Sequence, residues 1–197
     1  MLGGLLERVV EAIVDAIAAG SYPAIVALMA LESALMPVPS EIVMPFAGFL
    51  VARGEMSFAG AVAAGVLGNL LGSVASYCVG RRWGRRAALR LPWVEEDHLR
   101  IAENFFQRRG IIALLLGRMA PVVRTVISLP AGMAGVGPIT LVLTTIAGSV
   151  PWNAALVWAG VILEENWGVV RTYLEPVSII VVIAAAAYIY LKLRGGR

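Results

Sequence analysis

The chain has 197 residues, of which 59% are apolar and 15% are charged, with a mean hydropathy of +0.83; soluble domains average about 45–50% apolar and about 25% charged residues. This composition excludes a disordered chain, a nucleic-acid-binding domain and an ordinary cytosolic enzyme, and it predicts an all-α protein that crosses a membrane several times. The single cysteine, Cys78, and the single histidine, His98, exclude an internal disulfide and a cysteine-rich or multi-histidine metal centre, so we expect no metal and no cofactor.

The net charge of +3 is small, and its distribution along the chain predicts the orientation in the membrane. Residues 81–110 carry eight arginines against four acidic residues, a net charge of +4, and the C-terminal tail adds three more basic residues. Residues 1–20 and 164–175 each have a net charge of −2. Because cytoplasmic loops carry the excess of Lys and Arg, the 81–110 segment and the C-terminus are expected in the cytoplasm. The N-terminal helix and the 164–172 loop are then expected outside.

Residues 1–20 predict an amphipathic helix. Glu7, Glu11 and Asp15 recur every four residues and share one helical face, with aliphatic residues on the other. These acids interrupt the apolar run, and the start lacks positive charge, which excludes a secretory signal peptide. The helix is expected to lie in the membrane interface. A helix packed against the rest of the protein is the alternative.

Three segments are long and apolar enough to span the membrane, which takes about 20 residues: 57–80, 138–163 and 174–193. The first has a small residue at every fourth position from Gly60 to Gly80. This spacing predicts a flat face that another helix can approach closely, either in the same chain or in a homodimer.

Two further apolar segments, 22–51 and 111–136, are interrupted by prolines. Proline at such short intervals cannot sustain a continuous helix, and the first segment is too long for a single crossing. We expect each to form a re-entrant hairpin that enters the membrane, breaks near its middle and leaves on the same side. Non-helical backbone at that depth is tolerated only inside protein or beside a water-filled cavity, so both hairpins should line the interior.

The two broken segments begin two similar halves. In each, an Ala-Gly pair ends eleven residues after a proline, at Gly48 and at Gly132, and a spanning helix and a Trp-Gly pair follow in the same order. The offset between the halves is 80–84 residues. Since the halves are predicted to start on opposite sides, residues 22–80 and 111–163 are expected to form an inverted repeat within one membrane domain. Transporters of this architecture bind substrate between their broken elements near the bilayer midplane.

Four ionisable residues lie within the predicted hairpins, Glu32 and Glu41 in the first and Arg118 and Arg124 in the second. Each charge near the bilayer centre costs about 2.5–3.5 kcal/mol on insertion scales, so pairing between acids and bases is expected. A static salt-bridge core is one interpretation. Buried ion pairs stabilise a fold less well than apolar packing does, which favours a functional interpretation.

The residue types indicate a proton-coupled anion site. The planar fork of arginine matches phosphate oxygens, so Arg118 and Arg124 are the candidate phosphate ligands. A glutamic acid in an apolar cavity can take up a proton near neutral pH, so Glu32 and Glu41 are the candidate proton carriers. Protonation of either acid would release its arginine partner to bind an anionic headgroup.

Three polar residues on the spanning segments are candidates to line the same cavity, although they could equally join helices by hydrogen bonds: Asn69, Ser73 and Asn153. An intramembrane lipid phosphatase would need a nucleophile or general base beside the arginines. His98 lies in the charged segment that is predicted outside the membrane, so an enzyme is not expected and no catalytic residue is assigned.

Several of these motifs resemble the DedA family, also called SNARE-associated or VTT-domain membrane proteins. The resemblance covers about residues 25–165. It rests on the segments Glu32–Pro37, Pro39–Glu41, Ala47–Gly48, Gly117–Arg124 and Pro130–Gly132. It implies that the acidic pair of the family falls on Glu32 and Glu41, and its arginine pair on Arg118 and Arg124.

The resemblance also implies a multi-pass lipid transporter of the bacterial inner membrane. Members are linked to recycling of undecaprenyl phosphate, the lipid carrier of cell-wall synthesis, or to movement of phospholipids such as phosphatidylethanolamine. We therefore expect a proton-coupled flippase for undecaprenyl phosphate, with a membrane lipid and protons as partners. A phosphatidylethanolamine flippase or scramblase and a proton-coupled antiporter are the alternatives within transport, and a lipid phosphatase is the alternative from another class.

Overall fold

A computed structural model describes residues 2–36, 38–84, 86, 106, 110–118 and 123–164, and the described part is helical, without strands. The helices are α1 (Leu2–Ser33), α2 (Ser40–Ala52), α3 (Phe58–Val79), α6 (Val123–Val126), α7 (Ser128–Met133) and α8 (Pro138–Ile162), with a π-helical turn at Gly80–Gly84 and a further helical stretch at 110–118. The predicted C-terminal span 174–193, the 164–172 loop beyond residue 164 and most of the basic 81–110 segment with His98 lie outside the described residues.

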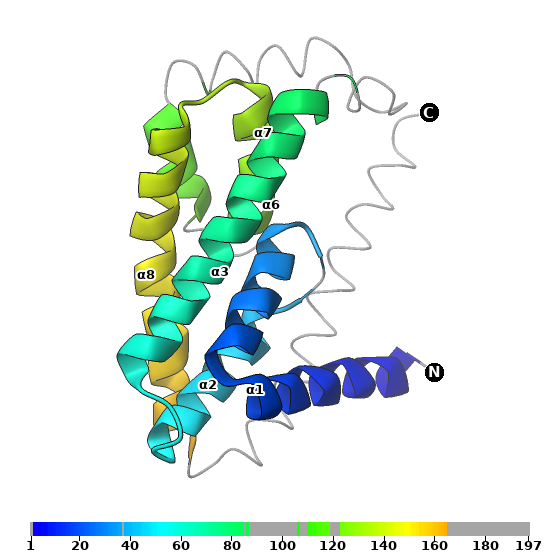
Figure 1. The fold of residues 1–197 in the computed structure, drawn as a ribbon, viewed down its shortest axis with the longest axis vertical. Coiled ribbons are helices and arrows are strands. Elements are labelled where there is room, and N and C mark those ends of the chain that lie inside the picture. The colour runs from blue at the N-terminus through cyan, green and yellow to red at the C-terminus, as the bar shows by residue number, and fades with distance from the viewer. Residues whose placement is uncertain are drawn as a thin grey trace.

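Helices α3 and α8 form the long framework of the molecule and run side by side in Figure 1. Their 22 and 25 residues correspond to about 33 and 38 Å at 1.5 Å per residue, enough to cross a hydrocarbon core of about 30 Å. The Ser57 hydroxyl caps α3 by accepting from the Gly60 N–H at 3.1 Å, and Pro138 stands in the first turn of α8. The predicted long apolar helices at 57–80 and 138–163 are therefore confirmed.

Helix α1 is two helices joined at a kink, with Ser21 at φ 48° and ψ −134°. A third segment long and apolar enough to span a membrane, Ala12–Ser33, includes this kink. Figure 1 shows the N-terminal half of α1 projecting sideways, away from α3 and α8 and at a steep angle to the half that follows. The twelve residues after the kink reach only about 18 Å, which is too short for a crossing.

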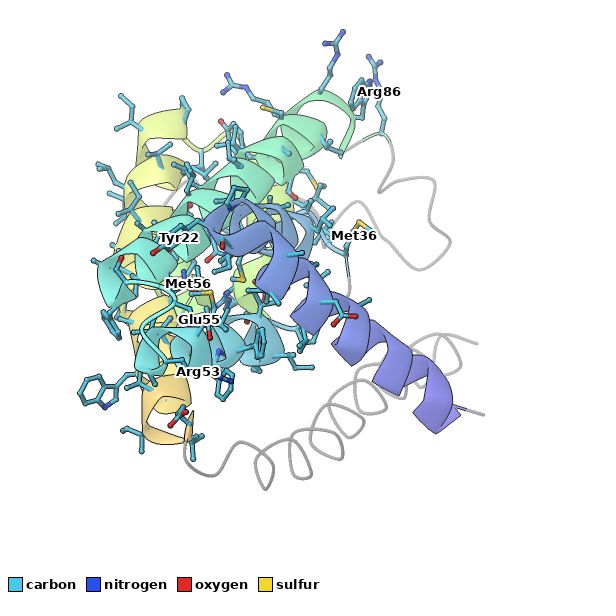
Figure 2. All side chains as sticks on the ribbon, turned by 60° about the horizontal axis from the view of Figure 1, so that its bottom comes forward. Tyr22, Met36, Arg53, Glu55, Met56 and Arg86 are labelled. Carbon is cyan, nitrogen blue, oxygen red and sulfur yellow. The ribbon has the colours of Figure 1, made fainter. Side chains whose placement is uncertain are left out.

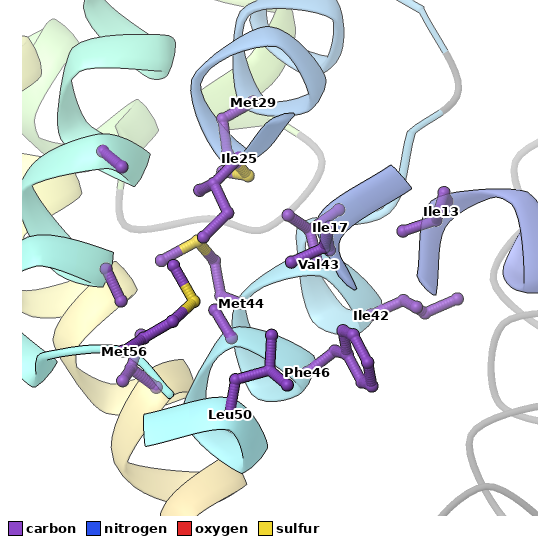
Figure 3. Packing of buried hydrophobic residues seen from close by; sticks show 14 residues of the cluster. Ile13, Ile17, Ile25, Met29, Ile42, Val43, Met44, Phe46, Leu50 and Met56 are labelled. Atoms are coloured by element: carbon purple, nitrogen blue, oxygen red, sulfur yellow. The ribbon is translucent and has the colours of Figure 1, made fainter. Parts of the chain in front are cut away.

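The N-terminal half of α1 packs on protein through its apolar face. Ile13 and Ile17 are buried while Asp15 is exposed, and in Figure 3 the two isoleucines lie beside Ile42 and Val43 of α2. The amphipathic pattern was predicted to mark an interfacial helix. At these two positions its apolar side contacts α2, and the place of this helix in the membrane interface stays a prediction.

The first proline-containing segment forms a helix–turn–helix. The second half of α1 ends at Ser33, a turn follows at residues 34–36, and α2 returns toward the end where this half of α1 begins (Figure 1). The thirteen residues of α2 are about 20 Å long. The second proline-containing segment is also interrupted, since α6 and α7 have only four and six residues. Both segments are therefore broken helices, as their prolines predicted.

The small-residue stripe of α3 is an internal packing face. A Cβ atom at Gly68 would overlap the backbone carbonyl of Val26, and one at Gly72 would overlap that of Ala30, so α1 lies directly against this stripe. The Ser76 hydroxyl, on the same stripe, donates to the Ser33 carbonyl at 2.8 Å. The predicted close-packing face is confirmed, and because α1 occupies it, the stripe gives no support to a homodimer.

Two other pairs of glycines show a reciprocal pattern between the halves. Gly48 of α2 packs against the backbone of α8, and Gly160 of α8 packs against the backbone of α2. In the same way, Gly132 of α7 packs against the backbone of α3, and Gly80, directly after α3, packs against the backbone of α7. A Cβ at any of the four would overlap a carbonyl oxygen located three residues before the partner glycine. Each broken segment thus packs on the long helix of the other half, through equivalent contacts.

The buried side chains form two apolar clusters with a polar layer between them. One cluster includes Met29, Met44 and Val157 and is shown in Figure 3. The other includes Tyr77, Leu114 and Leu141. Along both α3 and α8 the buried polar residues occupy the positions between the two clusters: Asn69, Ser73, Ser76, Thr144, Thr145, Ser149 and Asn153. This layer lies in the middle of the two long helices and contains the candidate site.

Candidate functional site: two buried arginines in the polar layer

A buried ion pair joins the two broken segments. Arg124 of α6 donates through Nη2 to Oε2 of Glu32, at the end of α1, at 3.0 Å, and both side chains are only 6% exposed. Residues 92 positions apart therefore meet in the polar layer, and Glu32 connects α1 to α6.

Arg118 lies in the same layer and bonds to neutral groups. Its Nη1 donates to the Ser73 hydroxyl at 3.3 Å and its Nη2 to the Ser128 hydroxyl at 3.0 Å. Its side chain passes over Gly148 of α8, where an added Cβ would lie 2.8 Å from the Arg118 Cβ. Within the described part of the chain Arg118 forms no ion pair with a carboxylate. A buried charge without a counter-ion is costly, so this position favours an anion.

A pair of asparagines joins α3 to α8 beside the ion pair. Asn153 donates through Nδ2 to Oδ1 of Asn69 at 3.0 Å. Asn69 in turn donates to the Ser33 hydroxyl at 2.9 Å and to Glu32 Oε2 at 3.4 Å. The two asparagines are 84 residues apart, which matches the offset between the halves. The interhelical hydrogen bonds, one of the two roles predicted for them, are present, and Asn69 also lines the cavity of the site.

A small cavity lies in this polar layer, and both arginines line it. Its volume of about 10 Å³ leaves room for roughly one water molecule. It is lined by Ser33, Asn69, Arg118, Arg124, Gly148 and Ser149. A phosphate group needs more room than this, so an anion could enter only if a side chain in the site moves.

Three buried N–H groups have no acceptor among the described residues: Nε of Arg118 and Nη1 of Arg124, two residues that line the cavity, and Nε1 of Trp152, whose ring packs on Arg124. Such groups are rare in folded proteins, because an unmade buried hydrogen bond costs about 1–3 kcal/mol. Guanidinium and indole groups donate and do not accept. The ligand that would satisfy this set is rich in acceptor oxygens and negatively charged.

Glu41 stands apart from this network. It lies half-buried in the first turn of α2, and within the described ranges no hydrogen bond or ion pair involves it. The two acids of the sequence motif are therefore not equivalent, because Glu32 alone contacts an arginine there.

The sequence predicted no site role for four of these residues: Ser33, Ser128, Gly148 and Ser149. Ser33 follows Glu32 directly, and Ser128 lies one helical turn beyond Arg124. Ser149 precedes Asn153 by four residues and so shares its helical face. Among the described residues, no group of three or more His, Cys, Asp or Glu residues could hold a metal ion.

A family profile described as the VTT domain matches residues 38–162. The undecaprenyl phosphate transporter A of Bacillus subtilis is 33% identical over 164 residues, which are 80% of this chain and 83% of that protein. The uncharacterized membrane protein YkoX of the same organism is 32% identical over 199 residues, 98% of this chain and 88% of its own. No solved structure matches this chain significantly.

An "alkaline phosphatase-like protein" of Lactococcus lactis subsp. lactis is also similar, with 32% identity over 182 residues, 88% of this chain and 85% of that protein. The profile match covers well over half of the chain. With its long apolar helices and its buried charges, the chain is a helical membrane protein, and it belongs to the VTT-domain, or DedA, family.

Proposed function

We propose that this protein carries a lipid with a phosphate headgroup across the bacterial cytoplasmic membrane, and that the lipid is undecaprenyl phosphate. The observation that carries the proposal is Arg118, a guanidinium buried to 5% exposure that has only hydroxyl partners beside a cavity in the middle of the long helices. The name of the Bacillus subtilis relative supports the choice of lipid. The headgroup would enter the polar layer while the apolar chain stays in the surrounding lipid.

The Glu32–Arg124 ion pair provides a route to proton coupling. The cavity has room for about one water molecule, so a side chain of the site must move to admit a phosphate, and the carboxylate of Glu32 would be the group that leaves its place beside Arg124. Protonation of Glu32 removes the attraction between the two groups. Proton uptake and phosphate capture would then compete for one guanidinium. Glu41, in the first turn of α2, could pass protons toward Glu32.

The same architecture suggests how the lipid gains access from both sides. The helix–turn–helix of residues 22–51 and the broken segment 111–136 would enter the membrane as re-entrant hairpins from opposite faces. The reciprocal glycine contacts of Gly48 with Gly160 and of Gly132 with Gly80 support an inverted repeat. By charge, the 81–110 segment and the C-terminus would be cytoplasmic.

Single cysteines test this topology. Glu55 lies at one end of α3 and Arg86 beyond the other (Figure 2), and both are exposed. In a Cys78→Ala background, Ala19→Cys and Glu55→Cys should react with an impermeant maleimide in intact cells, whereas Arg86→Cys should react only after permeabilisation. If residues 22–51 crossed the membrane completely, the cysteines at 19 and 55 would be labelled from opposite sides.

Transport by purified protein in liposomes tests the function itself. A fluorescent short-chain polyprenyl phosphate in the outer leaflet should become protected from external quencher, and faster when the lumen is alkaline relative to the outside. A labelled phosphatidylethanolamine is the matched probe for the phospholipid alternative, and release of inorganic phosphate reports the phosphatase alternative. Equal rates for both lipids would contradict the choice of undecaprenyl phosphate, and phosphate release would contradict a transporter.

A further inference from the structure

The indole ring of Trp152 contacts Arg124, and the proposed transport mechanism assigns no role to it. Its ring lies under the guanidinium of Arg124, with Cζ 5.0 Å from the ring centroid, which is within the range of a cation–π interaction. Its Nε1–H is buried and finds no acceptor among the described residues. Buried indole N–H groups usually have a hydrogen-bond partner.

The place of Trp152 on α8 links it to both arginines. Gly148 and Trp152 are four residues apart and so lie on the same helical face, separated by about 6 Å along the axis. Arg118 packs over Gly148, and Arg124 packs over Trp152. One strip of α8 therefore supports the aliphatic part of Arg118 and the guanidinium of Arg124, and both arginines line the same cavity.

The indole ring also gives Arg124 a contact that persists when Glu32 no longer pairs with it. Only Nη2 of Arg124 is bonded to Glu32, and Nη1 has no partner within the described ranges. If Glu32 is protonated, the guanidinium keeps one contact that does not depend on the carboxylate, the face of the indole ring. An aromatic face restrains the position of a cation without occupying its donors.

We infer that Trp152 is a recognition and positioning residue of the phosphate site, an inference that rests on the proposed function. Its ring holds the guanidinium of Arg124 beside that of Arg118 after Glu32 releases it. Its indole N–H donates a hydrogen bond to an oxygen of the bound phosphate. The ligand class is a phosphate ester, whose oxygens can accept from the indole and from both arginines together.

The test follows the indole N–H signals of protein labelled with ¹⁵N-tryptophan in detergent, titrated with dodecyl phosphate. The signal of Trp152, identified by its absence in Trp152→Phe and by elimination with the other Trp→Phe variants, should move downfield and saturate. Trp158 is the matched control, because it lies on the same helix, is 59% exposed and packs edge-to-face on Phe58. Its signal should not move.

Binding of dodecyl phosphate separates the two roles of the side chain. Trp152→Phe keeps a ring and loses the N–H, so affinity should fall about fivefold. Trp152→Leu loses both, so the fall should exceed tenfold. Trp158→Phe should bind as the wild type does.

The outcomes are distinguishable from failure of the proposed function. If the wild type binds in a manner that depends on Arg118 while the Trp152 signal stays still, or if Trp152→Phe binds as tightly as Trp158→Phe, the inference about Trp152 is wrong and the phosphate site stands. If the wild type does not bind dodecyl phosphate at all, the proposed function is wrong and the inference is overturned with it.

Discussion

Arg118→Gln should fold, insert into the membrane and lose at least about 100-fold in affinity for a polyprenyl phosphate. Charge-assisted hydrogen bonds contribute about 1.5–3 kcal/mol each, and every 1.4 kcal/mol is tenfold in affinity. A glutamine can still bond the hydroxyl groups of Ser73 and Ser128, which now accept from the guanidinium. Because no carboxylate in the described part pairs with Arg118, the change leaves no acid stranded in the interior.

Arg118→Lys should recover less than a tenth of the affinity that Arg118→Gln loses relative to the wild type. A point charge cannot reproduce the planar fork of donors of an arginine. Binding is measured on purified protein, and heating followed by size-exclusion chromatography reports the fold. Arg53→Gln is the matched control, because Arg53 is an exposed arginine paired with Glu55 at 3.3 Å, and exposed pairs contribute little. Wild-type transport by Arg118→Ala/Arg124→Ala would rule out the phosphate site.

Arg124 differs from Arg118 in what its removal leaves behind. Arg124→Gln leaves the carboxylate of Glu32 buried without its cation, and breaking a buried pair in this way costs about 3–5 kcal/mol. If that variant failed to fold, the result would therefore not show whether Arg124 binds phosphate. The combination Glu32→Gln/Arg124→Gln removes both charges, and it should recover the fold without recovering the binding.

The framework of this fold could be predicted from local sequence. The long apolar helices and the small-residue face of α3 depend on spacing within one segment, and the structure contains both. The proline-containing segments are broken for the same local reason. The kink at Ser21 is less evident, since it lies two residues before a proline that the helix otherwise accommodates. It falls at Gly20-Ser21, just before Pro23, and helices commonly kink at a Gly-Ser pair or near a proline.

The sequence could not predict which charged and polar residues pair with each other within the site. The sequence places two acids and two arginines in the broken segments, yet only Glu32 meets Arg124, while Glu41 meets neither arginine within the described ranges. That choice depends on how α1, α2 and α6 pack across 92 residues of chain. The hydroxyl partners of Arg118 come from two further elements, and no periodicity connects them to an arginine.

Glu32→Gln should bind phosphate lipids at least as well as the wild type, and its transport should no longer respond to pH. The amide keeps the size of the side chain and an oxygen that can accept from Asn69, which now donates to Glu32 at 3.4 Å. It removes the negative charge that holds Arg124. The guanidinium is then available at every pH, as it would be after protonation of the acid.

The probe for this test must keep its own charge constant. A phosphate monoester takes up a proton near pH 6, which would confuse titration of the ligand with titration of the protein. Dodecyl methyl phosphate is a diester and stays singly charged between pH 5 and 8. For the wild type, its affinity should rise about tenfold or more as the pH falls through that range, because a charge-assisted bond to Arg124 is gained when Glu32 releases it.

For Glu32→Gln the affinity should stay flat, at the level that the wild type reaches at low pH. In liposomes the variant should exchange lipid equally fast with and without a pH gradient, because binding no longer needs a proton. Glu41→Gln is the matched control, since Glu41 is an acid of the same helix–turn–helix that does not pair with Arg124 in the described part of the chain. Its diester binding should keep the wild-type pH dependence. A static salt-bridge core makes the opposite prediction, because Glu32→Gln would then lower the thermal stability and leave pH-dependent transport in place.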